Sequence, residues 1–208
     1  MKEYYDARAS EYDDWYEGRG GFAARDRPGW EQELAELIRT IAALPPARTL
    51  DVACGTGFLT RHLRGDVVAL DQSARMLDEA RRRVGRATLV QGDALALPFP
   101  NDSFHRVFTG HFYGHLEEPE RARFLDEARR VAREVVVVDA SKEHSGIDEH
   151  MSPRMLDDGS TWEVYKRYFT GEGLAGELGG GEVLFEGRWF VVVRAATAAR
   201  LARDEQSS

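Results

Sequence analysis

The sequence is poor in cysteine and in long apolar runs. Cys54 is the single cysteine among 208 residues, so the chain can form neither an internal disulfide nor a cysteine-based structural zinc site. No apolar run approaches the roughly 18 residues that a membrane-spanning helix needs. The first residues, MKEYYDARASEYDDWY, lack the apolar centre of a secretory signal. We therefore expect a cytoplasmic protein without a membrane span.

Positive charge is also in deficit. The chain has 28 Lys and Arg against 36 Asp and Glu, which gives a formal net charge of -8. Such a balance repels a phosphate backbone on average, so nucleic acid is not an expected partner. The local run Arg81-Arg82-Arg83 ends a predicted helix and is typical of a solvated face.

Strand-like and helix-like segments alternate along most of the chain, within the length of one domain covering residues 1–208. Connections between them are short, which favours a doubly wound α/β fold with a parallel sheet. The expected strands are 49–53, 67–70, 88–90, 104–108 and 135–138, and the expected helices are 31–44, 58–63, 73–84 and 119–132.

The pattern becomes less regular after Asp139. Residues 141–160 are polar and predict a long loop or a partly helical insertion. A short helix near 173–178 and a hairpin formed by 183–185 and 189–193 follow, and we expect residues 195–208 to fray.

A glycine-rich loop, Asp51-Val-Ala-Cys-Gly55-Thr-Gly57, follows the first expected strand. In doubly wound sheets this is where ligands bind, and the glycines let a backbone approach them closely. The third glycine of the dinucleotide-binding pattern is missing, because Phe58, Leu59 and Thr60 follow Gly57. An acid at position 51 instead suits a ligand that carries an ammonium and a sulfonium. The alternative is a tight strand-to-helix turn without a ligand.

Two further acids stand at the ends of the next strands. Asp71 comes 20 residues after Asp51, where a carboxylate can accept hydrogen bonds from both ribose hydroxyls. The alternative role for Asp71 is a helix N-cap, for which Ser73 competes. Asp93 follows the third strand and is expected beside an adenine amino group, with the backbone N–H of Ala94 near a ring nitrogen. Together the three acids predict an adenosine-containing ligand.

The stretches LDVACGTGFLT, ALDQS and QGDALALPFPNDSFHRVF, with the terminal hairpin, resemble the class I S-adenosylmethionine-dependent methyltransferases. The resemblance covers residues 4–195 and is greatest to the ubiquinone and menaquinone biosynthesis branch, with its methyltransferase type 11 domain. It implies a Rossmann-like three-layer α/β/α sandwich, whose seven-stranded, mostly parallel sheet has an antiparallel last strand inserted between its neighbours. S-adenosylmethionine is the implied cofactor. The implied cofactor-binding residues are Tyr12, Asp51, Ala53, Gly55, Gly57, Asp71, Gln72, Met76, Asp93, Ala94, Thr109 and Gly110.

The resemblance also divides the chain by role. Residues 1–30 are expected as an N-terminal lid segment, 47–140 as the cofactor-binding core, 141–169 as an acceptor-side insertion and 170–195 as the terminal helix and hairpin. For the first segment an equal alternative is an amphipathic helix that packs on the domain through Tyr5, Tyr12, Trp15 and Tyr16. Another aromatic group, Trp162, Tyr165, Tyr168 and Phe169, either lines an acceptor pocket or packs in the core.

Candidate catalytic residues follow the fourth strand, in Thr109-Gly-His111-Phe-Tyr113-Gly-His115. Histidine suits a general base for a phenol, enol or amine. His111 is the preferred candidate for acceptor contact or proton removal and Tyr113 a weaker one, whereas His115 is expected to pack at the start of the next helix. His144 and His150 lack a well-spaced third ligand, so no metal site is predicted.

These observations predict an S-adenosylmethionine-dependent methyltransferase that acts on oxygen, nitrogen or carbon of a small molecule. The fourth strand lacks an Asn/Asp-Pro-Pro-Tyr/Phe motif, which argues against methylation of DNA bases. One alternative is a module that binds the cofactor without transferring its methyl group. Another is a nucleotide-sugar or NAD-dependent enzyme, disfavoured by the missing glycine and by the absence of a Tyr-x-x-x-Lys catalytic pair. No pattern points to a particular oligomeric state.

Overall fold

A mostly parallel sheet forms the centre of the computed structural model, which describes residues 2–197. Its strand order is β3-β2-β1-β4-β5-β9-β8. The first five strands along the chain pair in parallel, and β9 lies antiparallel between β5 and β8. The strands are β1 (Thr49–Val52), β2 (Val67–Asp71), β3 (Thr88–Gln91), β4 (Phe104–Gly110), β5 (Ala132–Ala140), β8 (Glu182–Glu186) and β9 (Phe190–Ala196). The predicted seven-stranded sheet with an inserted antiparallel last strand is confirmed.

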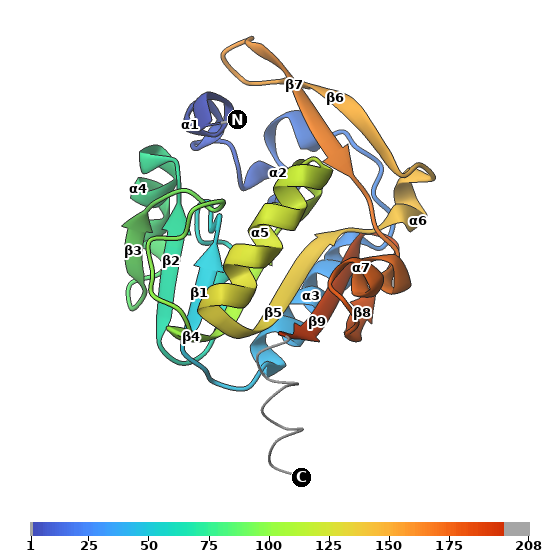
Figure 1. Ribbon diagram of the computed structural model, residues 1–208. Coiled ribbons are helices and arrows are strands. Elements are labelled where there is room, and N and C mark those ends of the chain that lie inside the picture. The colour runs from blue at the N-terminus through green and yellow to red at the C-terminus, as the bar shows by residue number, and fades with distance from the viewer. Residues whose placement is uncertain (1, 198–208) are drawn as a thin grey trace.

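Helices cover both faces of this sheet. Figure 1 shows α5 (Glu118–Val131) crossing one face, with α3 (Trp30–Ala43) behind the sheet. Helix α4 (Ala74–Arg83) packs against β2 and β3, and α7 (Gly171–Glu177) packs against β8 and β9. The result is the three-layer α/β/α arrangement that the sequence analysis predicted. Within residues 2–197, no helix combines the length and apolar character that crossing a bilayer requires.

The four consecutive valines of β5 show why the sheet is buried on both sides. Val135 and Val137 pack in the same core cluster as Phe124 of α5. Val136 and Val138 belong to the cluster on the opposite face, with Ile41 of α3. Side chains alternate between the faces of a strand, so a continuous apolar run is what a two-sided core requires.

The segment after β5 differs from the predicted loop or partly helical insertion. A short helix, α6 (Lys142–Ser145), precedes an antiparallel hairpin of β6 (Glu149–Met155) and β7 (Thr161–Arg167). Only Ser152 is buried in β6, so the strand lacks the apolar alternation by which such elements are recognised. Backbone pairing with β7 forms it. In Figure 1 this hairpin arches away from the main sheet, above β5 and α5.

Three smaller expectations were also wrong in detail. The predicted helix 58–63 is a single 3₁₀ turn, η2 (Thr60–His62), because Leu63 is already extended and the chain must enter β2 at Val67. Helix α7 begins at Gly171 rather than 173, with the Thr170 side chain accepting from the Gly173 N–H at 3.0 Å. Ala195 and Ala196 belong to β9 rather than to a frayed end, and residues 198–208 lie outside the described part of the chain.

The N-terminal segment crosses the carboxyl edge of the sheet. It contains α1 (Lys2–Arg8), α2 (Asp14–Glu17) and the 3₁₀ turn η1 (Gly20–Phe22). The Ser73 hydroxyl at the start of α4 donates to Asp6 at 2.5 Å, and the Tyr4 ring lies 5.9 Å from the Trp162 ring of β7. The segment therefore bridges α4 and the β6–β7 hairpin.

Candidate functional site

The loop between β1 and η2 has a left-handed backbone at three positions. Gly55 (φ 55°), Gly57 (φ 78°) and Ala53 (φ 58°) all have positive φ angles. A Cβ on Gly57 would lie 2.7 Å from Val84 Cγ1, so this glycine permits close packing on the α4 side. Ala53 has no such freedom, and a left-handed non-glycine residue costs of order 1–3 kcal/mol. Strain of this kind is commonly found where a loop is shaped for a ligand.

Asp71, at the carboxyl end of β2, holds this loop in place. Its Oδ2 accepts a hydrogen bond from the Gly55 N–H at 2.9 Å, and its Oδ1 accepts from the Ser73 N–H at 2.8 Å. Ser73 is the N-cap of α4, because its hydroxyl accepts from the Met76 N–H at 3.1 Å. Asp71 is thus not the cap. A carboxylate has about four lone-pair sites, so it retains capacity to accept from a ligand.

A cavity opens against the glycine loop, with an empty volume of about 810 Å³. We call it the glycine-loop cavity. Its charged lining residues are Asp71, Asp93 and Glu120, and it is lined by no lysine or arginine of the described chain. Nine of the expected cofactor-binding residues line it: Tyr12, Ala53, Gly55, Asp71, Gln72, Met76, Asp93, Ala94 and Gly110. An acidic cavity suits a small cationic ligand.

The other three expected residues lie elsewhere. Gly57 faces α4, as described above. Thr109 is fully buried, and its hydroxyl donates to the carbonyl of Val52 at 2.8 Å. Asp51 faces a smaller cavity whose walls include Tyr12, Ala53 and Gly110, which also line the glycine-loop cavity. Asp51 therefore does not line the glycine-loop cavity but lies beside it, behind the three residues that the two cavities share.

Asp51 is held in an unusual electrostatic state. Only 2% of the residue is exposed, and its Oδ2 accepts a hydrogen bond from the Thr60 hydroxyl at 2.6 Å. Burial raises the pKa of Asp51 to about 7, against the opposing effect of the Thr60 hydrogen bond, and the charge of Asp71 raises it further. A cation placed nearby would favour the ionised form.

His111 and Tyr113 occupy very different surroundings. His111 follows β4 with φ 56°, and burial lowers its pKa to about 3. Its Nε2 is buried without a hydrogen-bond partner, and its ring packs 4.7 Å from that of Trp15. Tyr113 instead points into the body of the protein, where its hydroxyl donates to Glu177 at 3.1 Å. It is not among the lining residues of the cavities described here.

His115, which was expected to pack at the start of the next helix, lines a cavity on the glycine loop. Its Nδ1 lies 2.7 Å from the carbonyl oxygen of Tyr165. A carbonyl can only accept, so Nδ1 carries the proton and Nε2 is the nitrogen with the lone pair. Burial lowers the pKa of His115 to about 3, with the neighbouring charge of Lys166 acting in the same direction. This histidine is therefore neutral at physiological pH, with the lone pair on Nε2.

A second cavity adjoins the first and has the opposite charge. We call it the arginine cavity; its empty volume is about 1030 Å³. Tyr5, Tyr12, His111 and His115 line both cavities. The cationic lining residues are Arg8, Arg25, Arg27, Arg154 and Lys166, and Asp26 is the acidic one. These cations were not predicted, because they come from residues 8–27 and from the β6–β7 hairpin and form no run or regular spacing in the sequence.

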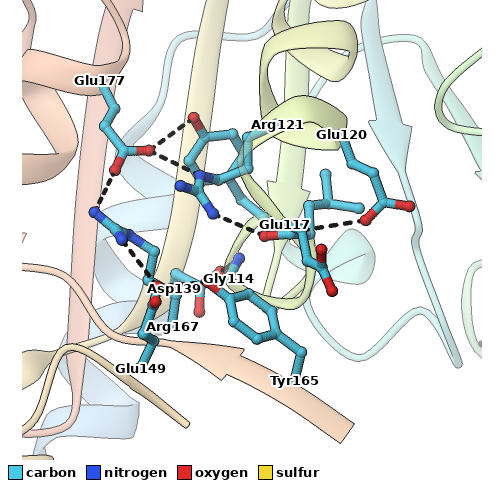
Figure 2. A network of polar contacts seen from close by, with 11 residues as sticks. Gly114, Glu117, Glu120, Arg121, Asp139, Glu149, Tyr165, Arg167 and Glu177 are labelled. Carbon is cyan, nitrogen blue, oxygen red and sulfur yellow. Dashed lines mark hydrogen bonds and ion pairs between the residues drawn. The ribbon is translucent and has the colours of Figure 1, made fainter. Parts of the chain in front are cut away.

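The hairpin that supplies Arg154 and Lys166 is tied to the body of the protein by a polar network (Figure 2). Arg167 of β7 pairs with Glu177 of α7 at 2.8 Å and with Glu149 of β6 at 3.1 Å. Glu177 also accepts from Arg121 of α5 at 3.1 Å. These contacts join the hairpin to α5 and α7 and fix its position over the arginine cavity.

The aromatic groups of the sequence analysis divide between the core and the cavities. Phe169 is buried in the core, and Tyr168 lines the arginine cavity. His144 and His150 both contact the Tyr168 ring, at centroid distances of 5.2 and 5.7 Å. His144 also lines the arginine cavity, whereas His150 does not line it and stacks on the Tyr168 ring.

Known proteins resemble this chain in sequence and in structure. Residues 49–135 match the family described as a methyltransferase domain, a span that holds the glycine loop, Asp71 and Asp93. The chain is 38% identical over 100 residues to demethylmenaquinone methyltransferase of Renibacterium salmoninarum, covering 47% of this chain and 41% of that protein. Residues 49–135 are thus a methyltransferase domain, and the chain resembles the class I S-adenosylmethionine-dependent methyltransferases.

Relatives of this chain differ in what their names say they act on. A dTDP-3-amino-3,4,6-trideoxy-alpha-D-glucopyranose N,N-dimethyltransferase of Streptomyces venezuelae is 42% identical over 89 residues, covering 41% of this chain and 35% of that one. The chain thus matches less than half the length of these two curated relatives.

Solved structures match over a longer span. The complex of DhpI with SAH has a TM-score of 0.70 and 26% sequence identity, covering 94% of this chain and 95% of that one. The complex of DhpI with SAM and HEP has a TM-score of 0.71 and 27% identity, covering 92% and 94%. The likeness therefore includes the N-terminal segment and the β6–β7 region as well as the cofactor-binding core.

Proposed function

We propose that this chain transfers the methyl group of S-adenosylmethionine to a small molecule. The observation that carries the proposal is the pair of adjoining cavities with a shared wall of Tyr5, Tyr12, His111 and His115. One cavity lies on the glycine loop and is acidic, as a ligand with an ammonium and a sulfonium requires. A module that only held the cofactor would have no need of the second cavity.

The lining residues fit the parts of the cofactor. Asp71, at the end of β2, would accept hydrogen bonds from the ribose hydroxyls, and Asp93 would accept from the adenine amino group beside the Ala94 backbone. The methionine end would lie near Gly55 and Gly110, with its ammonium toward Asp51. Tyr12 and Tyr5 cover this cavity from the N-terminal segment, which supports a lid role for residues 1–30.

Bound S-adenosylmethionine supplies an electrophilic methyl group that is displaced in line by a nucleophile. The protein must then align the acceptor with that methyl, exclude water and, where the acceptor group is protonated, remove a proton. The shared wall is where alignment takes place. Tyr12 belongs to this wall, and Trp15 packs against His111 beside it.

We assign the role of base, where one is needed, to His115 rather than to His111. His115 has its proton fixed on Nδ1 by the Tyr165 carbonyl, which leaves Nε2 able to accept one. His111 has an enclosed Nε2 among aromatic rings, which suits a residue that shapes the wall. Tyr113, bonded to Glu177 away from the cavities, is assigned a structural role.

The remaining assignments follow the same division. We propose one domain, residues 1–208, in which 47–140 form the cofactor-binding core, 141–169 the acceptor side and 170–195 the terminal helix and hairpin. The cytoplasm is the proposed location, since the single thiol of Cys54 is free. A small molecule rather than nucleic acid is the proposed acceptor, because the cations gather inside a cavity while the chain as a whole carries a charge of -8.

The test is a turnover assay with isotope-labelled S-adenosylmethionine and a panel of small acceptors. Methyl transfer and stoichiometric S-adenosylhomocysteine should be detected together by mass spectrometry, and both should fall when Asp71 is replaced by Ala. Cofactor binding without turnover on any acceptor class would support the binding-module alternative instead.

A further inference from the structure

The two cavities differ in charge in a way that points to the acceptor. The glycine-loop cavity has only acidic residues among its charged lining, whereas the arginine cavity has five cationic residues and Asp26. Building on the proposed function, we propose that the acceptor carries an oxyanion, a carboxylate or phosphoryl group, which the guanidinium groups of the arginine cavity bind. The chain as a whole has a net charge of -8, so the positive charge is concentrated in this cavity and does not reflect the overall composition.

Arg154 of β6 is half-buried and lines the arginine cavity. Its backbone lies opposite Trp162 in the β6–β7 ladder, but its guanidinium has neither a hydrogen bond nor an ion pair to any residue between 2 and 197. Burial lowers the pKa of Arg154, and the nearby cations Arg8 and Arg25 act in the same direction. Like charges brought together without a counterion cost free energy, and a bound oxyanion would remove that cost.

Two other guanidinium groups are already held in place. Arg8 donates to the Tyr4 hydroxyl at 2.8 Å, and its guanidinium lies 4.9 Å from the centre of the Tyr12 ring. Arg27 donates to the Trp15 carbonyl at 2.6 Å and lies 4.0 Å from the Trp30 ring centre. Neither has a carboxylate partner in the described chain. Each uses part of a five-donor fork, so N–H groups remain for a ligand.

The acidic groups nearby do not neutralise this charge. Asp139 is fully buried and is paired with Lys166 at 2.5 Å, which cancels the lysine rather than an arginine. Asp26 is exposed on the N-terminal segment, as is Arg25. It is the single acid among the described residues that line the cavity together with Arg8, Arg25, Arg27 and Arg154. An oxyanion that binds two of them would form the bidentate contacts for which arginine is suited.

Aromatic side chains indicate a second property of the acceptor. Trp15, Trp30, Tyr168 and Trp189 line the same cavity. Rings of this kind bind an apolar or planar body, so the acceptor combines an oxyanion with such a body. A neutral or cationic acceptor would leave the guanidinium groups unpaired.

The experiment uses four probes of similar shape with the full chain saturated with S-adenosylhomocysteine. Benzoate and phenyl phosphate carry the two oxyanions, benzamide is the neutral isostere of benzoate, and benzamidine is the cationic one. Binding is followed by quenching of tryptophan fluorescence, since Trp15, Trp30 and Trp189 line the cavity. The variants are Arg154→Gln and Arg8→Gln. Arg123→Gln, an exposed position on α5, is the control with the same change in net charge.

We expect at least one oxyanion to bind roughly tenfold more tightly than benzamide, and benzamidine to bind more weakly than either. Affinity for that oxyanion should fall roughly tenfold in Arg154→Gln and in Arg8→Gln, but not in Arg123→Gln. It should also weaken as salt rises from about 0.05 to about 0.5 M. The tighter of the two oxyanions identifies the acceptor's anionic group.

Equal affinity for benzamide, unchanged affinity in Arg154→Gln, or no binding of any probe would each overturn the proposal. Failure of S-adenosylhomocysteine to bind would count against the proposed function and not against this inference. In that event the same four probes, applied to the protein without it, still decide whether the arginine cavity prefers an anion.

Discussion

The carboxylate of Asp71 accepts a hydrogen bond from the backbone N–H of Gly55 at 2.9 Å. This contact joins the end of β2 to the loop after β1, between neighbouring parallel strands. The same carboxylate faces the glycine-loop cavity. One side chain thus both stiffens the loop and is available to a ligand, and its removal should affect binding in both ways.

Replacing Asp71 by Ala should weaken the binding of S-adenosylhomocysteine by roughly 1–3 kcal/mol, because ribose hydroxyls and the Gly55 N–H lose their acceptor. Asp71→Asn retains one acceptor oxygen, so its affinity for S-adenosylhomocysteine should lie between that of Asp71→Ala and that of the parent. Calorimetric titration measures the affinities. Asp78→Ala, at an exposed position of α4, is the matched control. Unchanged affinity in Asp71→Ala would remove the ribose assignment.

Asp51 should make cofactor binding depend on pH. Its pKa of about 7 in the ligand-free protein means that much of it is protonated at pH 6, whereas a nearby ammonium favours the ionised form. Affinity for S-adenosylhomocysteine should therefore rise roughly tenfold from about pH 6 to about pH 8 and level off above that.

Asp51→Asn provides the comparison for this pH profile. The amide keeps an acceptor for the Thr60 hydroxyl but cannot ionise, so the rise should be much smaller in the variant. Burial raises the pKa of Asp71 as well, and the difference between the two profiles isolates the share of Asp51. Identical profiles would mean that Asp51 does not sense the ligand.

Tyr113→Phe should separate a structural from a catalytic role. The variant loses the hydrogen bond to Glu177 while the ring stays packed against Phe124 and Phe169. We expect a loss of about 1 kcal/mol in the free energy of unfolding, measured by denaturant titration, with turnover close to that of the parent. A large fall in kcat with unchanged stability would instead indicate that Tyr113 takes part in the reaction.

The two histidines are distinguished by substitutions that preserve their packing. His115→Asn retains a donor for the Tyr165 carbonyl but removes Nε2, and should lower kcat by roughly 10²-fold or more for an acceptor that must lose a proton. S-adenosylhomocysteine affinity should stay close to that of the parent. With a pKa near 3, His115 should introduce no step in the pH profile of kcat around pH 6.5.

For His111 the expected pattern is different. His111→Phe should mainly alter KM, because this residue shapes the wall between the cavities. A dependence of kcat on His111 that exceeds the dependence on His115 would reverse the assignment of the base.

Much of the fold could be predicted because its signals are local. The valine run of β5 and the loop from Asp51 to Gly57 each combine an unmistakable pattern with a known place in doubly wound sheets. The β6–β7 hairpin could not be predicted, since β6 has one buried residue, Ser152. Its stability comes from pairing with β7 and from the Arg167–Glu177 contact, which only the folded chain brings together.

In the candidate site, too, some features could be predicted from local sequence and others form only in the folded chain. Residues at the carboxyl ends of strands, such as Asp71 and Asp93, were predicted to lie together because topology alone determines that edge. The hydrogen bond of His115 was not predicted, because it is made with the Tyr165 carbonyl, 50 residues further along the chain. The arginine cavity was missed for the same reason, since Arg8 and Arg154 become neighbours only across the folded edge.

The central claim is that the glycine-loop cavity binds S-adenosylmethionine. Parallel calorimetric titrations of the purified protein with S-adenosylmethionine, S-adenosylhomocysteine and NAD test it most directly. We predict binding of the first two and none of NAD, whose pyrophosphate would meet Asp71, Asp93 and Glu120. Binding of NAD alone, or of none of the three, would contradict the account.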